Sequence, residues 1–310
     1  MHRLRRFATL LGIIALPAFV LFPVLNASAD TQTVSPPEIQ TFGNPGDVVT
    51  ETLKVSNDGT NALKYQVGVA DFKAAGDEGA IDLLDDPNAP SSTFSLARWV
   101  TVEPSQFSVQ PGQDKNLNIT IRIPANAEAG TKLASVQLKI AGATVTGGSG
   151  ASVQSNLNSL ILLRVSGDIK EKLDIESFRT DKGYYTNGPV ALTLKSHNSG
   201  NAHVAPAGYI SITNEFGKKV KEIPLREANV LPDSSRSVRM DWTETGMIGR
   251  YTATLVATYG QQRQSLAAST TFIVFPVWLA AVLLAVIVVL LLLLTQRKNV
   301  KKIINRLTSD

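Results

Sequence analysis

Residues 45–59 read PGDVVTETLKVSNDG, and residues 188–200 read GPVALTLKSHNSG, so one pattern occurs twice in the chain. Each stretch begins with Gly and Pro, continues as a run in which apolar and polar residues alternate, and ends at an Asn-rich turn. Alternation is typical of strands that bury one face, because successive side chains of a strand point to opposite sides. The chain is therefore predicted to contain two domains that each open with a β-strand.

The same alternation continues through both halves of the chain. It is clearest at Leu63, Tyr65, Val67 and Val69, at Leu117, Ile119, Ile121 and Ile123, and at Val190, Leu192 and Leu194. Short strands separated by Pro-Gly and Asn-Gly turns are typical of β-sandwiches. We predict an all-β fold of two tandem Ig-like β-sandwich domains, at residues 30–165 and 166–271, plus one C-terminal transmembrane helix.

The membrane helix is predicted at residues 272–294, which read FIVFPVWLAAVLLAVIVVLLLLL without a single charge. At about 1.5 Å per residue such a helix spans about 34 Å, enough to cross a hydrocarbon core of about 30 Å. Five cations follow in the tail at residues 295–310, namely Arg297, Lys298, Lys301, Lys302 and Arg306. Cations gather on the cytoplasmic side of a span, so we expect the C-terminus inside and the sandwiches outside.

Both faces of the membrane have expected contact residues. Phe275 and Trp278, together with Phe272, lie where the chain enters the predicted span and fit an aromatic interface belt. Arg297 and Lys298 are expected to mark the inner interface. The lipid bilayer, crossed once, is therefore a predicted partner.

A signal peptide is predicted at residues 1–29. Arg3, Arg5 and Arg6 precede an apolar run at residues 7–25, and the small residues Ala27 and Ala29 form a cleavage signal. Asp30 is then the first residue of the mature chain. The alternative is an uncleaved N-terminal anchor, which also leaves residues 30–271 outside.

The basic composition reflects targeting and topology. The chain has 30 Lys and Arg and 26 Asp and Glu, of which three basic residues lie in the signal peptide, and five basic residues and Asp310 in the tail. The exported part is left with 22 basic and 25 acidic residues, a net charge near −3. Nucleic acid is excluded as a partner, since its binding requires clustered cations. The absence of cysteine excludes disulfides and thiolate sites, and in an exported chain it favours a bacterial envelope.

Two insertions in the first domain, residues 71–92 and 141–156, are expected to be exposed loops. The first carries six carboxylates against Lys73, and the second has GGSG at its centre. Carboxylates bind calcium, but these lack the Asp-x-Asp-x-Asp-Gly order, so a solvated loop is expected and a calcium site is the alternative. His197 and His203 are likewise expected to be solvated turn residues, with metal binding or base catalysis as the alternative.

Catalytic motifs are absent from the sequence. There is no Gly-x-Ser-x-Gly elbow, and a pair of glycosidase carboxylates cannot be recognised from sequence. We therefore predict that the chain is not an enzyme and has no catalytic, cofactor-binding or metal-binding residues. Trp99 and Trp242 are expected in the cores, whereas Tyr184, Tyr185 and Phe216 are expected on the surface.

Several blocks of the sequence form a recognisable series. They are residues 45–57, residues 99–112 (WVTVEPSQFSVQPG), residues 123–130 (IPANAEAG), residues 249–260 (GRYTATLVATYG) and residues 271–278 (TFIVFPVW). In this order they resemble the WxL-interacting protein family of Gram-positive cell surfaces. The resemblance implies a signal peptide, two Ig-like domains, one C-terminal span and a basic tail. It also implies that the first domain is associated with peptidoglycan and the second with secreted proteins that carry a Trp-x-Leu motif.

The sequence thus predicts a membrane-anchored cell-surface protein that links the membrane to cell-wall peptidoglycan and secreted surface proteins. The alternative is a membrane-tethered, chaperone-like assembly factor for exported subunits, because sandwich edges pair readily with extended segments. An envelope hydrolase is the third class.

Overall fold

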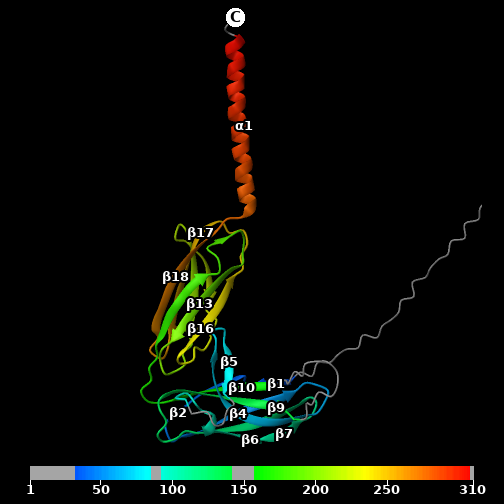
Figure 1. Ribbon diagram of the computed structural model, residues 1–310, viewed down its shortest axis with the longest axis vertical. Helices are drawn as coiled ribbons and strands as arrows, with labels where there is room; N and C mark the ends of the chain where they lie inside the picture. Colours follow the sequence, from blue (N-terminus) through cyan, green and yellow to red (C-terminus); the bar gives the residue numbers. More distant parts are fainter. Residues whose placement is uncertain (1–31, 85–91, 142–156, 308–310) are drawn as a thin grey trace, which may run out of the picture.

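The chain forms two β-sandwiches followed by one helix in the computed structural model (Figure 1). The structure describes residues 32–84, 92–141 and 157–307, with side chains as far as Leu294. The predicted signal peptide, its cleavage residues Ala27, Ala29 and Asp30, and residues 142–156 of the second insertion lie outside this described part. The expected fold class, two tandem Ig-like β-sandwich domains with a C-terminal helix, is confirmed.

The first sandwich is built from two sheets. One has four strands in the order β1-β3-β8-β6, and the other has six, in the order β2-β10-β9-β4-β5 with β7 also on β4. The strands are β1 (Gln32–Ser35), β2 (Glu38–Gly43), β3 (Val48–Asn57), β4 (Leu63–Ala75), β5 (Ala80–Leu84), β6 (Val100–Glu103), β7 (Gln106–Val109), β8 (Gln113–Arg122), β9 (Gly130–Ile140) and β10 (Leu157–Val165).

The second sandwich has a three-stranded sheet, β11-β13-β16, packed on a five-stranded sheet, β12-β18-β17-β14-β15. Its strands are β11 (Leu173–Thr180), β12 (Tyr184–Tyr185), β13 (Val190–Asn198), β14 (Ala207–Asn214), β15 (Lys219–Pro224), β16 (Ser234–Trp242), β17 (Gly249–Tyr259) and β18 (Gln264–Val274). The sandwich stands between the first sandwich and the helix (Figure 1).

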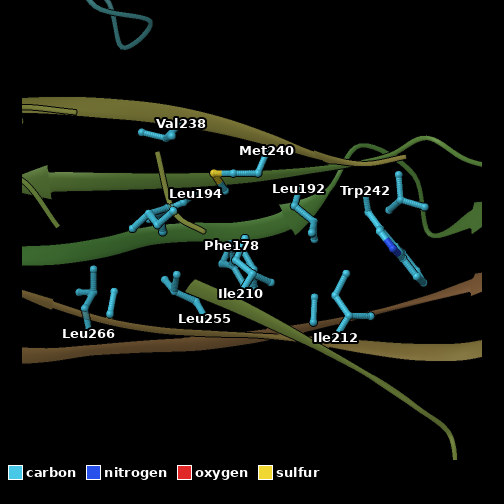
Figure 2. Close-up of a cluster of buried hydrophobic side chains, with 14 of the residues drawn as sticks. Phe178, Leu192, Leu194, Ile210, Ile212, Val238, Met240, Trp242, Leu255 and Leu266 are labelled. Atoms are coloured by element: carbon cyan, nitrogen blue, oxygen red, sulfur yellow. The ribbon is translucent and has the colours of Figure 1, made fainter. Parts of the chain in front are cut away.

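Each core lies between the two sheets of its sandwich, and alternation selects its members. In the first, Leu117, Ile119 and Ile121 of β8 are fully buried. In the second, Leu192 and Leu194 of β13 face Ile210, Ile212 and Leu255 from the opposite sheet (Figure 2). The alternation in the sequence therefore identified the inward faces.

Four aromatic rings close the end of the second core that lies nearest the helix. Trp242 packs edge-on against Tyr251 and Phe272, with ring centroids 5.1 and 6.0 Å apart. Tyr251 stacks on Phe272 at 5.8 Å, and Tyr185 meets Phe272 at 5.9 Å. Edge-on and offset arrangements suit the ring quadrupoles, so this cluster joins both sheets specifically.

The predicted span at residues 272–294 begins too early. Phe272 and Val274 belong to β18 and are 1% and 0% exposed in the second core, whereas Ile273 between them faces outward. The apolar sequence continues without interruption from strand into helix, so composition alone did not separate the two. Phe272 is a core residue and not part of an interface belt.

The C-terminal helix α1 runs from Val277 to Leu307. Its segment Val277–Leu294 has a mean hydropathy of 3.4 and is not buried against the rest of the protein. Those 18 residues extend about 27 Å, which is close to the thickness of a hydrocarbon core. By length and composition α1 is a candidate membrane span.

The first insertion is a β-hairpin where the sequence predicted a solvated loop. Asp71 to Ala75 end β4, Ala80 to Leu84 form β5, and five residue pairs join them in antiparallel register. Phe72, Ile81 and Leu83 pack into a small apolar cluster, which gives the hairpin an anchored face. Apolar residues alternate with the acidic ones in this insertion, and their burial decides its structure.

We predict that Phe272→Ala lowers the free energy of unfolding by about 3–5 kcal/mol, because it removes a fully buried ring from the aromatic cluster. Thr271→Ala, at the exposed neighbouring position of β18, is the control and should change it by less than about 0.5 kcal/mol. Urea unfolding of the detergent-solubilised chain measures both. Equal effects of the two substitutions would contradict the placement of Phe272 in the core.

Candidate functional site: the domain junction and the open edge of the second sandwich

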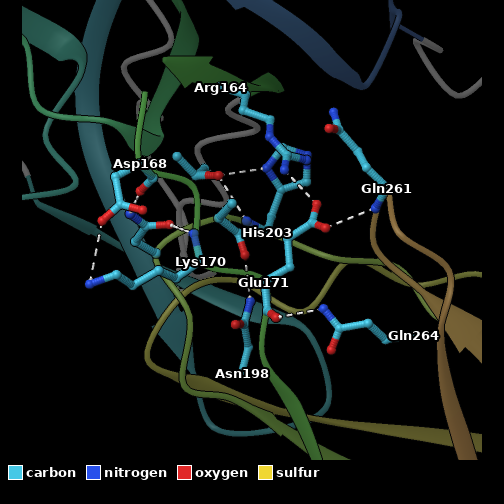
Figure 3. Close-up of polar contacts among 11 residues, drawn as sticks. Arg164, Asp168, Lys170, Glu171, Asn198, His203, Gln261 and Gln264 are labelled. Carbon is cyan, nitrogen blue, oxygen red and sulfur yellow. Dashed lines mark hydrogen bonds and ion pairs between the residues drawn. The ribbon is translucent and has the colours of Figure 1, made fainter. Parts of the chain in front are cut away.

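The junction between the sandwiches contains a nearly buried ion pair (Figure 3). Arg164, near the end of β10, and Glu171, in the connection before β11, lie 2.5 Å apart, and their side chains are 19% and 7% exposed. Glu171 also accepts a hydrogen bond from the backbone N–H of Gln261 at 2.8 Å, and its carbonyl accepts one from Gln264 at 3.2 Å. Glu171 therefore joins the first sandwich to the β17–β18 turn of the second.

His203 lies beside this pair and not in solvent as expected. The Thr131 hydroxyl accepts a hydrogen bond from the backbone N–H of His203 and lies 2.8 Å from its Nδ1. Burial, and after it the nearby charge of Arg164, lower the pKa of His203 to about 4, while Glu171 acts in the opposite direction. A neutral ring fits this site, because Nδ1 is then free to accept the hydroxyl proton.

The backbones of the two sandwiches meet at Gly130. The N–H of Thr131 donates to the carbonyl of Asn201 at 2.8 Å. Gly130 has φ of +118°, and a Cβ added there would lie 2.5 Å from the Asn201 oxygen. Glycine therefore allows both the backbone conformation and the close approach.

The β4–β5 hairpin makes a second connection, at Asp77 in its turn. Its carboxylate binds Lys195 of β13 at 3.1 Å and accepts the Ser237 hydroxyl of β16 at 2.9 Å. Its backbone carbonyl accepts the N–H of Ser237 at 2.6 Å. The hydrogen bond from Lys195 lowers the pKa of Asp77, so this contact holds a charged carboxylate.

Apolar packing completes the junction. Phe72, Leu133 and Leu162 lie on the outer face of the six-stranded sheet, and Leu231 of the second sandwich packs against their cluster. Asn229 donates to Glu38 at 2.6 Å next to it. Ionic, backbone and apolar contacts therefore all cross the junction between the sandwiches, which lie at an angle to each other (Figure 1).

A groove of about 460 Å³ lies between the sandwiches. One wall comes from β2, β10 and the β4–β5 hairpin, and the other from the connection between β15 and β16 and the start of β16. The lining is mixed, with Leu160 and Ile81 beside Glu38, Arg226 and Arg236. Such a surface suits a peptide better than a small apolar ligand.

A second groove, of about 320 Å³, follows the open side of the second sandwich. It lies between the edge strands β15 and β16 and is lined by residues 223–226 and 239–241. Arg226 lines both grooves, and Arg239 is paired with Asp241 at 3.1 Å. The two grooves thus follow the same edge of β16 on either side of the Asp77 contact.

The backbone of β16 points hydrogen-bonding groups into the second groove. The N–H of Ser237 points away from β13, since it donates to Asp77. Strand groups alternate in direction, so the N–H and C=O of Arg239 and Asp241 point outward as well. Within the described residues, β16 has β13 as its neighbour on one side and no strand on the other.

The outer face of β11–β13–β16 carries a serine, a histidine and a carboxylate, but not in catalytic order. Ser235 donates its hydroxyl proton to Glu176 at 2.7 Å and lies 3.1 Å from His197 Nδ1. A catalytic triad places the histidine between the hydroxyl and the acid. Here the serine lies between the other two, and its hydrogen bond lowers the pKa of Glu176.

The other sequence-predicted residues are distributed over the molecule. Asp71 accepts hydrogen bonds from the N–H groups of Leu96 and Ala97, at 2.8 and 2.7 Å. Its carboxylate thereby satisfies N–H groups at the start of the short 3-10 helix η1 (Ala97–Trp99). Asp71 and Asp77 therefore bind different partners, and no group of three metal-ligating residues occurs among the described residues. Asp85 and Asp86 lie outside the described part.

The aromatic expectations were partly right. Trp242 is buried and Tyr184 and Phe216 are exposed, as expected, but Tyr185 is buried in the aromatic cluster. Trp99 is half-buried at the end of η1, outside a strand. Phe275 is half-buried, whereas Trp278 is 60% exposed. Helix α1 runs through Arg297 and Lys298, whose side chains lie outside the described part.

Comparison with known proteins gives weak structural likenesses. No family model and no curated protein sequence matches the chain. Among solved structures, the class 5 fimbriae chaperone CfaA is 13% identical over 77% of this chain and 99% of its own, with a TM-score of 0.41. A chain of the Salmonella enterica SafA pilin–SafB chaperone complex is 14% identical over 80% and 98%, with a TM-score of 0.36. Similarity at this level gives no information on a ligand of this chain.

Acid should weaken the junction through His203. Its pKa is about 4 in the folded chain and 6.5 in an ordinary histidine, so the unfolded chain binds the extra proton between these values. The free energy of unfolding should therefore fall as the pH is lowered from 6.5 towards 4. His203→Asn keeps an acceptor for Thr131 without a titrating ring, so its stability should change less between pH 7 and 5. Urea midpoints across this range test it, and parallel curves for the two chains would contradict the buried neutral ring.

Proposed function

We propose that this chain is a membrane-anchored, non-enzymatic assembly factor that binds an extended segment of an exported protein by strand addition to β16. The observation that carries the proposal is the free outer edge of β16 in the groove between β15 and β16. A partner strand placed there gains backbone hydrogen bonds to Arg239 and Asp241. Side chains on one face of that strand would meet the apolar part of the groove.

The chain itself supports this mode of binding. The carbonyl of Asp77, which lies in a different sandwich, already accepts a hydrogen bond from the same edge at Ser237. The outward N–H of Ser237 thus already pairs with a carbonyl from outside its sheet, and a partner strand would pair in the same way with the next outward groups of β16. The Asp77 contact fixes where a partner strand must stop.

The lining indicates the chemistry of the partner. Ile223, which is half-buried, offers apolar contact, whereas Leu225 and Met240 belong mainly to the core. The exposed Arg226 has no ion pair among the described residues. A partner segment with alternating apolar residues and a carboxylate near Arg226 fits this arrangement. The resemblance to WxL-interacting proteins assigns a secreted protein partner to the same domain.

The proposed location is supported by the apolar segment of α1. We place Val277–Leu294 in the cell membrane, with both sandwiches outside and the C-terminus in the cytoplasm. The groove then lies outside the membrane, where exported chains emerge unfolded. An assembly factor needs this position, because exposed strands of its client are prone to incorrect pairing.

The variant Arg239→Pro should abolish partner binding while leaving the fold intact. It removes an N–H that points into the groove, and proline is tolerated where an edge-strand N–H faces outward. Arg239→Ala is the matched control, since it removes the side chain and keeps the N–H. A photo-crosslinking amino acid at Ile223, in cells that express the chain, should give adducts with exported proteins that Arg239→Pro loses and Arg239→Ala keeps. Adducts that persist equally in both variants, or their absence from all chains, would contradict strand addition.

A second candidate function, a scaffold that binds peptidoglycan, has one observation in its favour. A hollow of about 380 Å³ on the first sandwich is lined by Trp99, Arg98 and Asn126, and by Lys132, which is buried and donates to the Thr93 carbonyl. Tryptophan faces stack on sugar rings, and amide and cationic groups donate hydrogen bonds to hydroxyls and carboxylates. The resemblance assigns peptidoglycan to this domain.

For this second function, Trp99→Tyr should keep sedimentation with purified peptidoglycan, and Trp99→Leu should reduce it at least about tenfold, the effect of about 1.4 kcal/mol of lost stacking. Both substitutions keep a large side chain against the core, so a fold defect would be visible as an equal loss in the two. Unchanged sedimentation of Trp99→Leu, or no sedimentation of the unaltered chain, would remove the peptidoglycan role.

A further inference from the structure

The end of the second sandwich nearest α1 exposes large apolar side chains. Phe216, in the β14–β15 turn, is 85% exposed, and Ile248, in the β16–β17 connection, is 45% exposed. Tyr184 of β12 and Ile273 of β18 are 52% and 46% exposed and are paired in register. Phe216 is the most exposed of the large hydrophobic side chains in the described residues.

Strand directions place these four side chains at one end. Asn214, which precedes the turn of Phe216, pairs with Tyr251, and Gly249, which follows Ile248, pairs with Val274. Both partners lie at the end of the sheet from which α1 leaves. The opposite end of the sandwich faces the first domain (Figure 1).

The connection from this end to α1 is short and fixed by hydrogen bonds. Phe275 and Pro276 separate β18 from α1. The N–H of Phe275 donates to the backbone carbonyl of Tyr185 at 2.8 Å, and the carbonyl of Phe275 accepts a hydrogen bond from the Tyr184 hydroxyl at 3.1 Å. Pro276 is buried. The apolar segment of α1 starts at Val277. A span that begins at Val277 therefore holds the sandwich end at the level of the lipid headgroups.

The charges at this end are nearly balanced. Lys219 pairs with Glu222 at 2.9 Å, and Lys221 pairs with Glu244 at 2.9 Å. Exposed Lys182 and Lys218 stand beside Asp181 and Glu215. Arg250, paired in register with Ile273, is exposed and has no ion pair among the described residues. The other charges at this end lie close to opposite ones, so apolar contact is the main attraction to a bilayer.

We propose that the end of the second sandwich nearest α1 docks on the outer leaflet of the membrane that α1 crosses, with Phe216 and Ile248 in the interfacial layer. This inference rests on the membrane anchor of the proposed function. Docking at Phe216 and Ile248, on separate connections, together with the anchor at Val277, fixes the tilt of the sandwich relative to the bilayer. The grooves along β16 are then held at a constant height and direction above the membrane.

Single cysteines test the proposal cleanly, because the chain has no cysteine of its own. The full-length chain is reconstituted in phosphatidylcholine vesicles with an NBD fluorophore at Phe216→Cys, Ile248→Cys, Val256→Cys or Leu290→Cys. Val256, the matched control, is 43% exposed on the same sheet. It lies seven residues along β17 from Gly249, and so about 24 Å farther than Gly249 from α1. Leu290, within the apolar segment of α1, reports on the anchor. Quenching is measured with lipids that carry a nitroxide near the headgroup and with aqueous iodide.

Docking predicts that the lipid nitroxide quenches the probes at 216 and 248 at least twofold more than the probe at 256, and that iodide gives the reverse order. Addition of anionic phosphatidylglycerol should leave this order unchanged. If 216 and 248 behave like 256 while 290 is protected from iodide, docking is wrong and the membrane anchor stands. If 290 is also accessible to iodide, the anchor itself fails, and the docking proposal with it. Urea unfolding of Phe216→Cys and Ile248→Cys confirms that the substituted chains are folded.

Discussion

The buried carboxylate of Glu171 is the contact on which the arrangement of the two sandwiches depends. It receives Arg164 from the first sandwich and a backbone N–H from the second. A carboxylate this well buried is stable only with such partners, and loss of either leaves a charge without compensation. The site therefore favours one geometry of the junction, and the grooves between and beside the sandwiches acquire a fixed shape from it.

Other contacts, away from Glu171, also fix the orientation of the two sandwiches. Asp77 reaches β16 from the tip of its hairpin, and Gly130 lets two backbones meet at hydrogen-bonding distance. Of these contacts, Asp77 covers the edge of β16 at Ser237 and leaves the second half of that edge open. A binding edge inside a rigid frame loses little entropy when a partner pairs with it, because the frame is already ordered.

Much of the fold could be predicted from the sequence, because alternation records which side of a strand is buried. Residues 45–59 and 188–200 include the true strands β3 and β13, and the inward residues of β8 were identified one by one. The junction could not be predicted. Arg164, Glu171 and His203 lie in turns or at a strand end, where no periodicity marks them, and their partners are distant in sequence. The end of β18 was missed for a different reason, since buried strand and membrane helix share one apolar composition.

The direct passage from β18 into α1 has a mechanical consequence. A pull on the first sandwich away from α1 enters the second sandwich through β11 and leaves it through β18, at opposite ends. These strands lie along the direction of the load, and β18 is paired with β17 over all residues from Gln264 to Val274. Its hydrogen bonds are then sheared together instead of being opened one after another. The second sandwich is thereby suited to bear tension along the line from the first sandwich to α1.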